Sequence, residues 1–270
     1  MRRRRRSPSL RLLTAALAVV ALGEISLPKA AVAEIPAVAQ RQRAEKKSFT
    51  DSQIVDGFLK VAFGAEHHLA GRVDRIRKYV TPVRVFADGA RADRKAQLAR
   101  VVADIARRVQ HLDIAMADND EAANVRVKLV RDRDLYRTMT SLFGRQRAGE
   151  IRASLDPQCL SGFRKNEKYE IDRSDVILTV DTGDFVFFDC AYEELLQSLG
   201  PINDTASVPW TMFNDNVSMG FFDIYDQYLL NLLYDPRIKA GMTVQEVKAV
   251  LPDVLADVRA WVRKVNNLPQ

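Results

Sequence analysis

Apolar side chains recur at helical spacing in several segments. Between Asp93 and Leu112, six apolar residues repeat every three or four positions, which predicts an amphipathic helix. Another helix is expected after Thr50 or Asp51, since either residue can cap it and the apolar residues that follow share one face. Shorter segments with the same spacing predict further helices over residues 135–143, 193–199 and 222–234, and one that Pro252 opens after a capping box at residues 243–246.

Other segments have the pattern of strands. Residues 125–129 alternate apolar and charged side chains, as a half-buried strand does, and residues 83–86 form a short β-like run after Pro82. Residues 176–180 and 185–188 are continuous apolar runs separated by the turn-rich quartet 181–184, which predicts a buried hairpin or two adjacent strands.

These elements predict an α+β fold in a single domain. The expected domain covers residues 48–270, with a mixed sheet packed with helices and a helical C-terminal part. Residues 34–47 have no apolar periodicity, so we expect a flexible leader there.

The first 33 residues have the order of an export signal. Arg2–Arg6 form a positive region before the apolar segment Leu12–Leu22, and Ala31-Val32-Ala33 matches a cleavage site, with Ala37-Val38-Ala39 as an alternative. As a helix the apolar segment would span about 16 Å, against the roughly 30 Å of a bilayer core, so a stable membrane anchor is not expected. The sequence therefore predicts a periplasmic or secreted protein.

Removing this segment changes the charge of the chain. Of 41 basic residues seven precede Glu34, and of 35 acidic residues one does, so 34 of each remain in the body of the chain. Proteins that bind nucleic acid rely on clustered basic residues that neutralise phosphates. The body of the chain has no excess of basic residues that could neutralise phosphates, so no nucleic-acid partner is expected.

The chain has two cysteines, Cys159 and Cys190. Two cysteines in an oxidising compartment usually pair, so we expect a structural disulfide. The rival hypothesis makes Cys190 a thiol nucleophile, but none of the three histidines is spaced to activate it.

One helix carries a motif with chemical meaning. Glu193, Glu194, Gln197, Gly200 and Asn203 form E-E-x-x-Q-x-x-G-x-x-N. The zinc-peptidase motif H-E-x-x-H-x-x-G-x-x-H places two ligands on one helical face, a general base after the first, and a glycine turn before a third ligand. Here Glu194 holds the base position and Gly200 the turn, while Glu193, Gln197 and Asn203 replace the three histidines.

With these residues the chain resembles a bacterial exported family of unknown function that is itself similar to the zincin metallopeptidases. Further segments carry the resemblance between residues 49 and 243. They are Arg75–Tyr79, Pro82–Val85, Cys190, Leu199–Asp204, Phe213–Asp215, Leu233–Arg237 and Gly241–Thr243. The resemblance implies a zincin-like architecture, with the Glu193 helix lying along a sheet.

The donor set does not suit zinc. Amide oxygens of Gln197 and Asn203 are poor replacements for imidazole, so no tight catalytic zinc and no other cofactor is expected. As an alternative, the oxygens of Glu193, Gln197, Asn203 and Asp204 could hold Ca²⁺ or Mg²⁺.

An aromatic segment follows the motif. Trp210 and Phe213, next to Asn214 and Asp215, could line a cleft beside the Glu193 helix together with Asp204. The competing interpretation is that the two aromatic rings pack into the core.

The sequence is compatible with three functions. The first is an exported, non-catalytic protein that binds a peptide, a protein or an envelope component in a former substrate cleft. The second is an active, peptidase-like hydrolase that uses Glu194 as general base with an atypical metal or none. The third is a structural envelope protein with a vestigial cleft.

Overall fold

The computed structural model describes residues 35–63, 74–155, 158–201 and 203–269. The chain separates into two units, residues 1–33 and 34–270, and the fold discussed below is that of the second. The division falls where cleavage after Ala33 is predicted. The signal peptide itself lies outside the described residues and stays a prediction.

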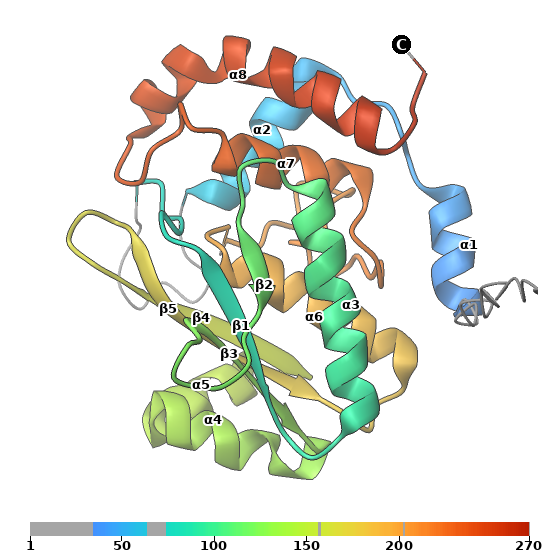
Figure 1. The fold of residues 1–270 in the computed structure, drawn as a ribbon, viewed down its shortest axis with the longest axis vertical. Coiled ribbons are helices and arrows are strands. Elements are labelled where there is room, and N and C mark those ends of the chain that lie inside the picture. Colours follow the sequence, from blue (N-terminus) through green and yellow to red (C-terminus); the bar gives the residue numbers. More distant parts are fainter. Residues whose placement is uncertain (1–34, 64–73, 156–157, 202, 270) are drawn as a thin grey trace, which may run out of the picture. The chain divides into compact units, whose positions relative to one another are not determined.

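A five-stranded sheet organises the chain (Figure 1). Its order is β2-β1-β3-β5-β4, in which β4 alone runs antiparallel to its neighbour. The alternating segment 125–129 forms β3 as predicted, with Val125, Val127 and Leu129 buried. The strands are β1 (Val83–Asp88), β2 (Ile114–Met116), β3 (Val125–Val130), β4 (Cys159–Lys165) and β5 (Ile171–Thr179).

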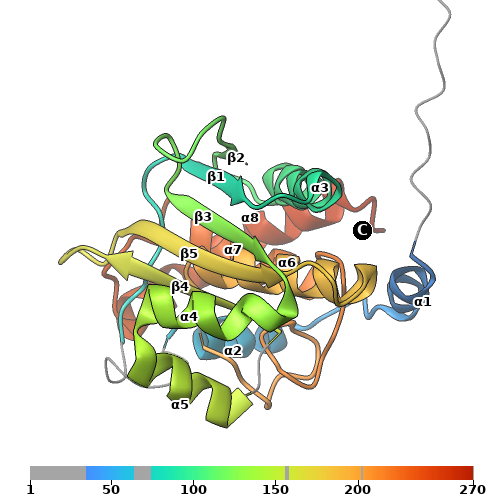
Figure 2. The same ribbon diagram turned by 90° about the horizontal axis from the view of Figure 1, so that it is seen from below.

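Helices cover both faces of the sheet. Ile177 of β5 packs with α4 and α5 in one apolar cluster, while its neighbours Val176 and Leu178 face the main core with α3, α6, α7 and α8. Figure 2 shows α4 and α5 beside the β4 end of the sheet, and α3 beside β1 and β2. The helices are α1 (Pro36–Ala44), α2 (Asp51–Ala62), α3 (Ala92–Arg108), α4 (Leu135–Phe143), α5 (Arg145–Leu155), α6 (Asp184–Ser198), α7 (Ile224–Tyr234) and α8 (Val244–Val265).

This architecture confirms the predicted α+β class, with a mixed sheet and a helical C-terminal part. Thr50, one of the two expected caps, caps α2 through a capping box with Gln53. The expected capping box at residues 243–246 is also present: Thr243 caps α8 and pairs with Glu246. Among the described residues, none of the helices is both long and apolar enough to span a membrane.

The hairpin expected over residues 176–188 was wrong. Phe185–Phe188 lie in the first turns of α6, and the antiparallel partner of β5 is β4, which precedes it. A run of four apolar residues does not distinguish a strand from a buried helix. Here Gly183, with φ of 100°, ends the turn and begins the helix.

Two further expectations differ from the structure. Residues 36–44 of the expected flexible leader form α1, where Val38 and Ala39 are buried. The helix expected to open at Pro252 is the second half of α8, which runs through that proline. Its buried face is continuous on both sides of Pro252, from Val247 and Leu251 to Val254 and Leu255, and packing there outweighs the one lost backbone hydrogen bond.

The segment Arg77-Lys78-Tyr79 is buried between the ends of three helices. Lys78 Nζ donates to the carbonyls of Leu233, Asp235 and Ile238 at 2.8, 3.2 and 2.6 Å, around the end of α7. Arg77 donates to the Ala62 carbonyl at the end of α2. Near Tyr79, the Tyr234 hydroxyl accepts from the Tyr79 amide and donates to the Leu199 carbonyl at the end of α6. We call residues 77–79 the capping segment.

Replacing Lys78 by methionine should strongly destabilise the fold. The substitution keeps most of the side-chain volume but leaves three carbonyls at the end of α7 without their donor, at a cost of about 3 kcal/mol or more. Urea unfolding followed by circular dichroism measures the loss. The matched control is Lys248→Met on the exposed face of α8, and equal stability of the two variants would contradict the assigned role of Lys78.

Candidate functional site

A disulfide fixes α6 against the edge of the sheet. Cys159, the first residue of β4, is bonded to Cys190 in α6 across a sequence separation of 31, with their Cα atoms 5.8 Å apart. The predicted pairing is confirmed. The rival hypothesis of a nucleophilic Cys190 thiol is wrong, because the sulfur is in the disulfide.

One face of α6 is polar. Asp189, Glu193 and Gln197 are spaced four residues apart and therefore share one side of the helix. The segment after α6 runs back along this side. Gln197 Nε2 donates to Asp204 Oδ1 at 2.9 Å, and Asp189 Oδ1 accepts from the amides of Met219 and Gly220 at 2.6 and 2.9 Å.

Three carboxylates meet on this face. One oxygen each from Glu193, Asp204 and Asp215 lies within 4.8 Å of the others. Glu193 and Asp204 are half-buried, and Asp215 is exposed. We call these three residues the carboxylate cluster. Two of them, Glu193 and Asp204, belong to the oxygen set expected for a hard cation, and Asp215 was expected only as a cleft residue.

Electrostatics in the cluster disfavour a charged Glu193. Burial, and then the negative charges of Glu194, Asp204, Asp189 and Asp215, raise the pKa of Glu193 to about 10. The raised pKa favours the protonated form of Glu193. Burial also raises the pKa of Asp189, although the two backbone amides that it accepts from oppose the shift.

Gln197 and Asn203, which stand where the zinc-peptidase motif has its second and third histidines, form hydrogen bonds inside the protein. Gln197 is buried; besides donating to Asp204, it accepts from Ser161 of β4 at 3.3 Å. Asn203 Nδ2 donates to the Lys60 carbonyl at 2.8 Å, at the end of α2. The structure thus brings Glu193 and Gln197 together with Asp204, while the amide of Asn203 is bonded to α2.

Gly200 forms the turn after α6 that the motif predicts. Its φ is 139°, and a Cβ at this position would lie 2.3 Å from the carbonyl oxygen of Arg77. Only glycine tolerates this conformation and this approach. The turn lets the chain leave α6 and bring Asp204 back to it.

Glu194 differs from Glu193 in exposure. Its side chain is buried, with 6% of its surface exposed. The two consecutive residues point about 100° apart around the helix, so Glu194 contributes charge to the surroundings of Glu193 without lying on the same face.

The expected cleft residues fall into two groups. Asp204 and Asp215 join the carboxylate cluster. Phe213 and Asn214 are buried, and Asn214 donates to the Val208 carbonyl inside its own loop. Trp210 packs against Phe49 and Tyr225, with Lys46 3.8 Å from the centre of its ring. The rings of Trp210 and Phe213 thus belong to apolar packing.

Two residues of this face were not predicted from the sequence. Asp189 is one helical turn before Glu193, so counting back four residues from the motif would have found it. Ser161 lies on a strand that the hydrophobic pattern did not reveal, since Ser161 and Gly162 interrupt the apolar residues of β4.

Most of the described fold matches one family of proteins. The model of a family described as "Protein of unknown function (DUF2927)" matches residues 51–253, in agreement with the expected resemblance to a family of unknown function. Neither the curated proteins nor the solved structures include a significant match.

The raised pKa of Glu193 predicts a particular pH dependence. Its pKa is higher in the folded chain than in the unfolded chain, so the folded state binds more protons between about pH 4.5 and pH 10. The free energy of unfolding therefore falls as pH rises through this window. Glu193→Gln removes this loss, so its Tm at pH 9 should exceed that of wild type by at least about 2–4 °C, which corresponds to about 1 kcal/mol and is a lower bound for a shift of this direction and size.

Thermal unfolding at pH 5, 7 and 9 without divalent cations tests this expectation. Glu167→Gln, at an exposed position between β4 and β5, is the control and should follow wild type. A Glu193→Gln curve parallel to wild type from pH 5 to pH 9 would contradict the assignment of a protonated Glu193.

Proposed function

The chain belongs to the DUF2927 family, and we propose that it is an exported, non-catalytic binding protein. Its proposed ligand is a peptide, a protein or an envelope component that presents a cationic group to the carboxylate cluster. The observation that carries this proposal is the convergence of Glu193, Asp204 and Asp215 on the face of α6 beside the edge strand β4.

The negative charges of the carboxylate cluster favour a cationic ligand. Negative groups held close together raise one another's free energy, and a bound cation relieves that repulsion. The raised pKa of Glu193 favours its neutral form, so binding of a cation should release protons from the cluster. An arginine or lysine side chain meets these requirements with hydrogen-bond donors as well as charge.

An extended peptide suits the surroundings of the cluster. β4 forms one edge of the sheet, and the disulfide and the Ser161–Gln197 hydrogen bond hold α6 next to it. An edge strand offers backbone donors and acceptors to a further strand. A peptide paired with β4 would run beside the helix that carries Glu193.

The proposal of a lost peptidase site rests on a zincin-like frame. In support, α6 packs along β4 and β5, as the resemblance implies, and Gly200 makes the motif's turn. Against metal chemistry of the zinc type stands the donor set, since Gln197 and Asn203 are amides that are hydrogen-bonded inside the chain.

Export to the periplasm or secretion is part of the proposal. It is supported by the order of charged, apolar and small residues over residues 1–33, and by the Cys159–Cys190 disulfide, which persists in oxidising compartments.

A second candidate is a hard cation. Three carboxylates with one oxygen each inside 4.8 Å match the ligands that Ca²⁺ and Mg²⁺ prefer. Such an ion would be held by Glu193, Asp204 and Asp215, with Asn203 no longer part of the set.

Peptide and metal titrations separate the two candidates. The probes are a six-residue peptide with a central lysine, the same peptide with acetyl-lysine, and CaCl₂, each titrated calorimetrically into the exported protein. The binding proposal predicts heat for the lysine peptide, at least tenfold weaker binding of the acetylated peptide, and a similar loss in Asp215→Asn.

The control for this experiment is Asp253→Asn, which removes an exposed carboxylate from α8. Saturable Ca²⁺ binding below about 1 mM that disappears in Asp215→Asn would establish the second candidate instead. Binding of neither probe, or equal binding by both variants, would overturn a role of the cluster in recognition.

The hydrolase alternative has its own test. Glu194 is buried, whereas a general base must reach the water or group that it deprotonates. We therefore expect no peptide hydrolysis above background in either wild type or Glu194→Gln when labelled casein is the substrate. Hydrolysis by wild type that disappears in a folded Glu194→Gln variant would replace the binding proposal with an enzymatic one.

A further inference from the structure

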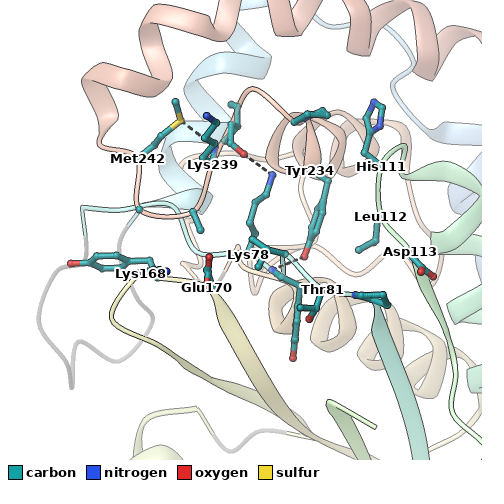
Figure 3. A pocket seen from close by; sticks show the side chains of 18 of the residues that line it. Lys78, Thr81, His111, Leu112, Asp113, Lys168, Glu170, Tyr234, Lys239 and Met242 are labelled. Atoms are coloured by element: carbon teal, nitrogen blue, oxygen red, sulfur yellow. Dashed lines mark hydrogen bonds between the residues drawn. The ribbon is translucent and has the colours of Figure 1, made fainter. Parts of the chain in front are cut away.

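A large cavity lies at the end of the sheet where β1, β2 and β5 begin. Its volume is about 980 Å³, and it is open to solvent. Four segments enclose it: residues 78–82 before β1, 111–113 before β2, 168–170 before β5, and 234–246 from the last residue of α7 to the first turn of α8. Figure 3 shows Lys168 and Glu170 on one side, Leu112 and Asp113 on the other, and Lys78 and Tyr234 between them. We call it the amino-end cavity.

Part of the lining is apolar and exposed. Val80, with 55% of its surface exposed, is the most exposed of the large apolar side chains in the described part of the chain. Pro236 is exposed and Met242 is half-buried, and both also line the cavity; Leu112 lines it too but is buried, with 8% of its surface exposed. Exposed apolar surface inside a concave site is typical of places that bind the apolar part of a ligand.

The charged groups of the lining are not equivalent. Its acids accept hydrogen bonds from nearby residues of the chain: Asp113 from both terminal nitrogens of Arg84, Glu246 from Thr243, and Glu170 from Asn166. Lys168 and Lys239 are exposed and form no ion pair with any residue that the structure describes.

The two lysines come from loops that meet. Gly241 lies against the Lys168 carbonyl, where an added Cβ would approach its oxygen to 3.3 Å, and φ of Gly241 is 83°. The loop that carries Lys168 and the loop that carries Lys239 are thus in contact. The positive groups available to a ligand therefore lie at this junction.

Backbone strain is concentrated at the same cavity. Three non-glycine residues in the described ranges have positive φ, namely His111, Tyr169 and Asn267 at 63°, 65° and 52°. His111 and Tyr169 both line the cavity. Left-handed backbone at bulky side chains is unfavourable and tends to cluster at ligand sites.

We propose that the amino-end cavity binds a small amphipathic anion, with its acid group at Lys168 and Lys239 and its apolar body against Val80, Pro236 and Met242. The volume fits a small organic acid, since ligand sites commonly enclose about 300–1,000 Å³. An anionic ligand is preferred because Lys168 and Lys239 have no ion-pair partner among the described residues. The acids of the lining, in contrast, already accept hydrogen bonds from the chain. The site shares no residue with the carboxylate cluster, so it does not depend on the function proposed above.

Decanoate is the probe that tests the proposal. It should bind the exported protein with 1:1 stoichiometry in calorimetry, and Lys168→Glu/Lys239→Glu should weaken binding at least tenfold. Both side chains are exposed, so reversing their charges leaves the core intact, which the Tm verifies. Lys248→Glu, on the exposed face of α8 outside the cavity, is the control and should bind like wild type.

Decyltrimethylammonium, with the same chain and the opposite charge, distinguishes a site for anions from a merely apolar surface. The proposal predicts at least tenfold weaker binding of this cation, and weaker binding of decanoate to Val80→Asp. Equal affinity for the two probes, or unchanged decanoate binding in the double lysine variant, would overturn it.

Discussion

Two buried cations at the ends of helices hold the middle of this protein together. Arg77 and Lys78 donate to carbonyls at the ends of α2 and α7, which are the negative ends of their helix dipoles. Burial lowers the pKa of Lys78 to about 8, so keeping an ammonium there is costly unless its three carbonyl acceptors stay in place. The buried cations and the helix ends therefore depend on each other. Moving α2 or α7 would leave a buried charge, or the carbonyls that it binds, without hydrogen bonds.

The same segment determines the geometry around α6. The Arg77 carbonyl lies so close to Gly200 that no side chain fits there, and the Tyr234 hydroxyl beside Tyr79 donates to the Leu199 carbonyl. The C-terminal end of α6 is therefore fixed by the capping segment, and its middle by the disulfide from Cys190 to β4. With the helix held at two points, the chain after Gly200 has to return along its polar face. That path is what brings Asp204 and Asp215 to Glu193.

Sequence patterns predicted the elements whose side chains face one environment at a regular period. The helix α3 and the strand β3 are examples, because each has one buried and one solvated side; α3 nevertheless ends at Arg108, four residues before the Leu112 at which the apolar spacing placed its end. The pattern failed at Phe185–Phe188, where residues of a largely buried helix show no periodic contrast, and at β4, whose apolar residues are interrupted. For the site, the spacing of the motif located Glu193 and Gln197, which are close in sequence. It could not place Asp215 at Glu193, because that contact depends on how a loop folds back. The amino-end cavity could not be predicted for the same reason, since its four segments are distant in the chain.

The charges of residues 34–270 also need to be considered locally. The 34 basic and 34 acidic residues of this part of the chain cancel overall, which is why no nucleic-acid partner is expected. The cancellation has no bearing on small ligands, because charges further apart than about 8 Å are largely screened at physiological ionic strength. Within that distance, the face of α6 gathers carboxylates around Glu193, and the amino-end cavity has lysines without ion-pair partners among the described residues. A chain whose overall charge is balanced can therefore have different local charges at two places, and this difference underlies the cationic ligand proposed for one place and the anionic ligand proposed for the other.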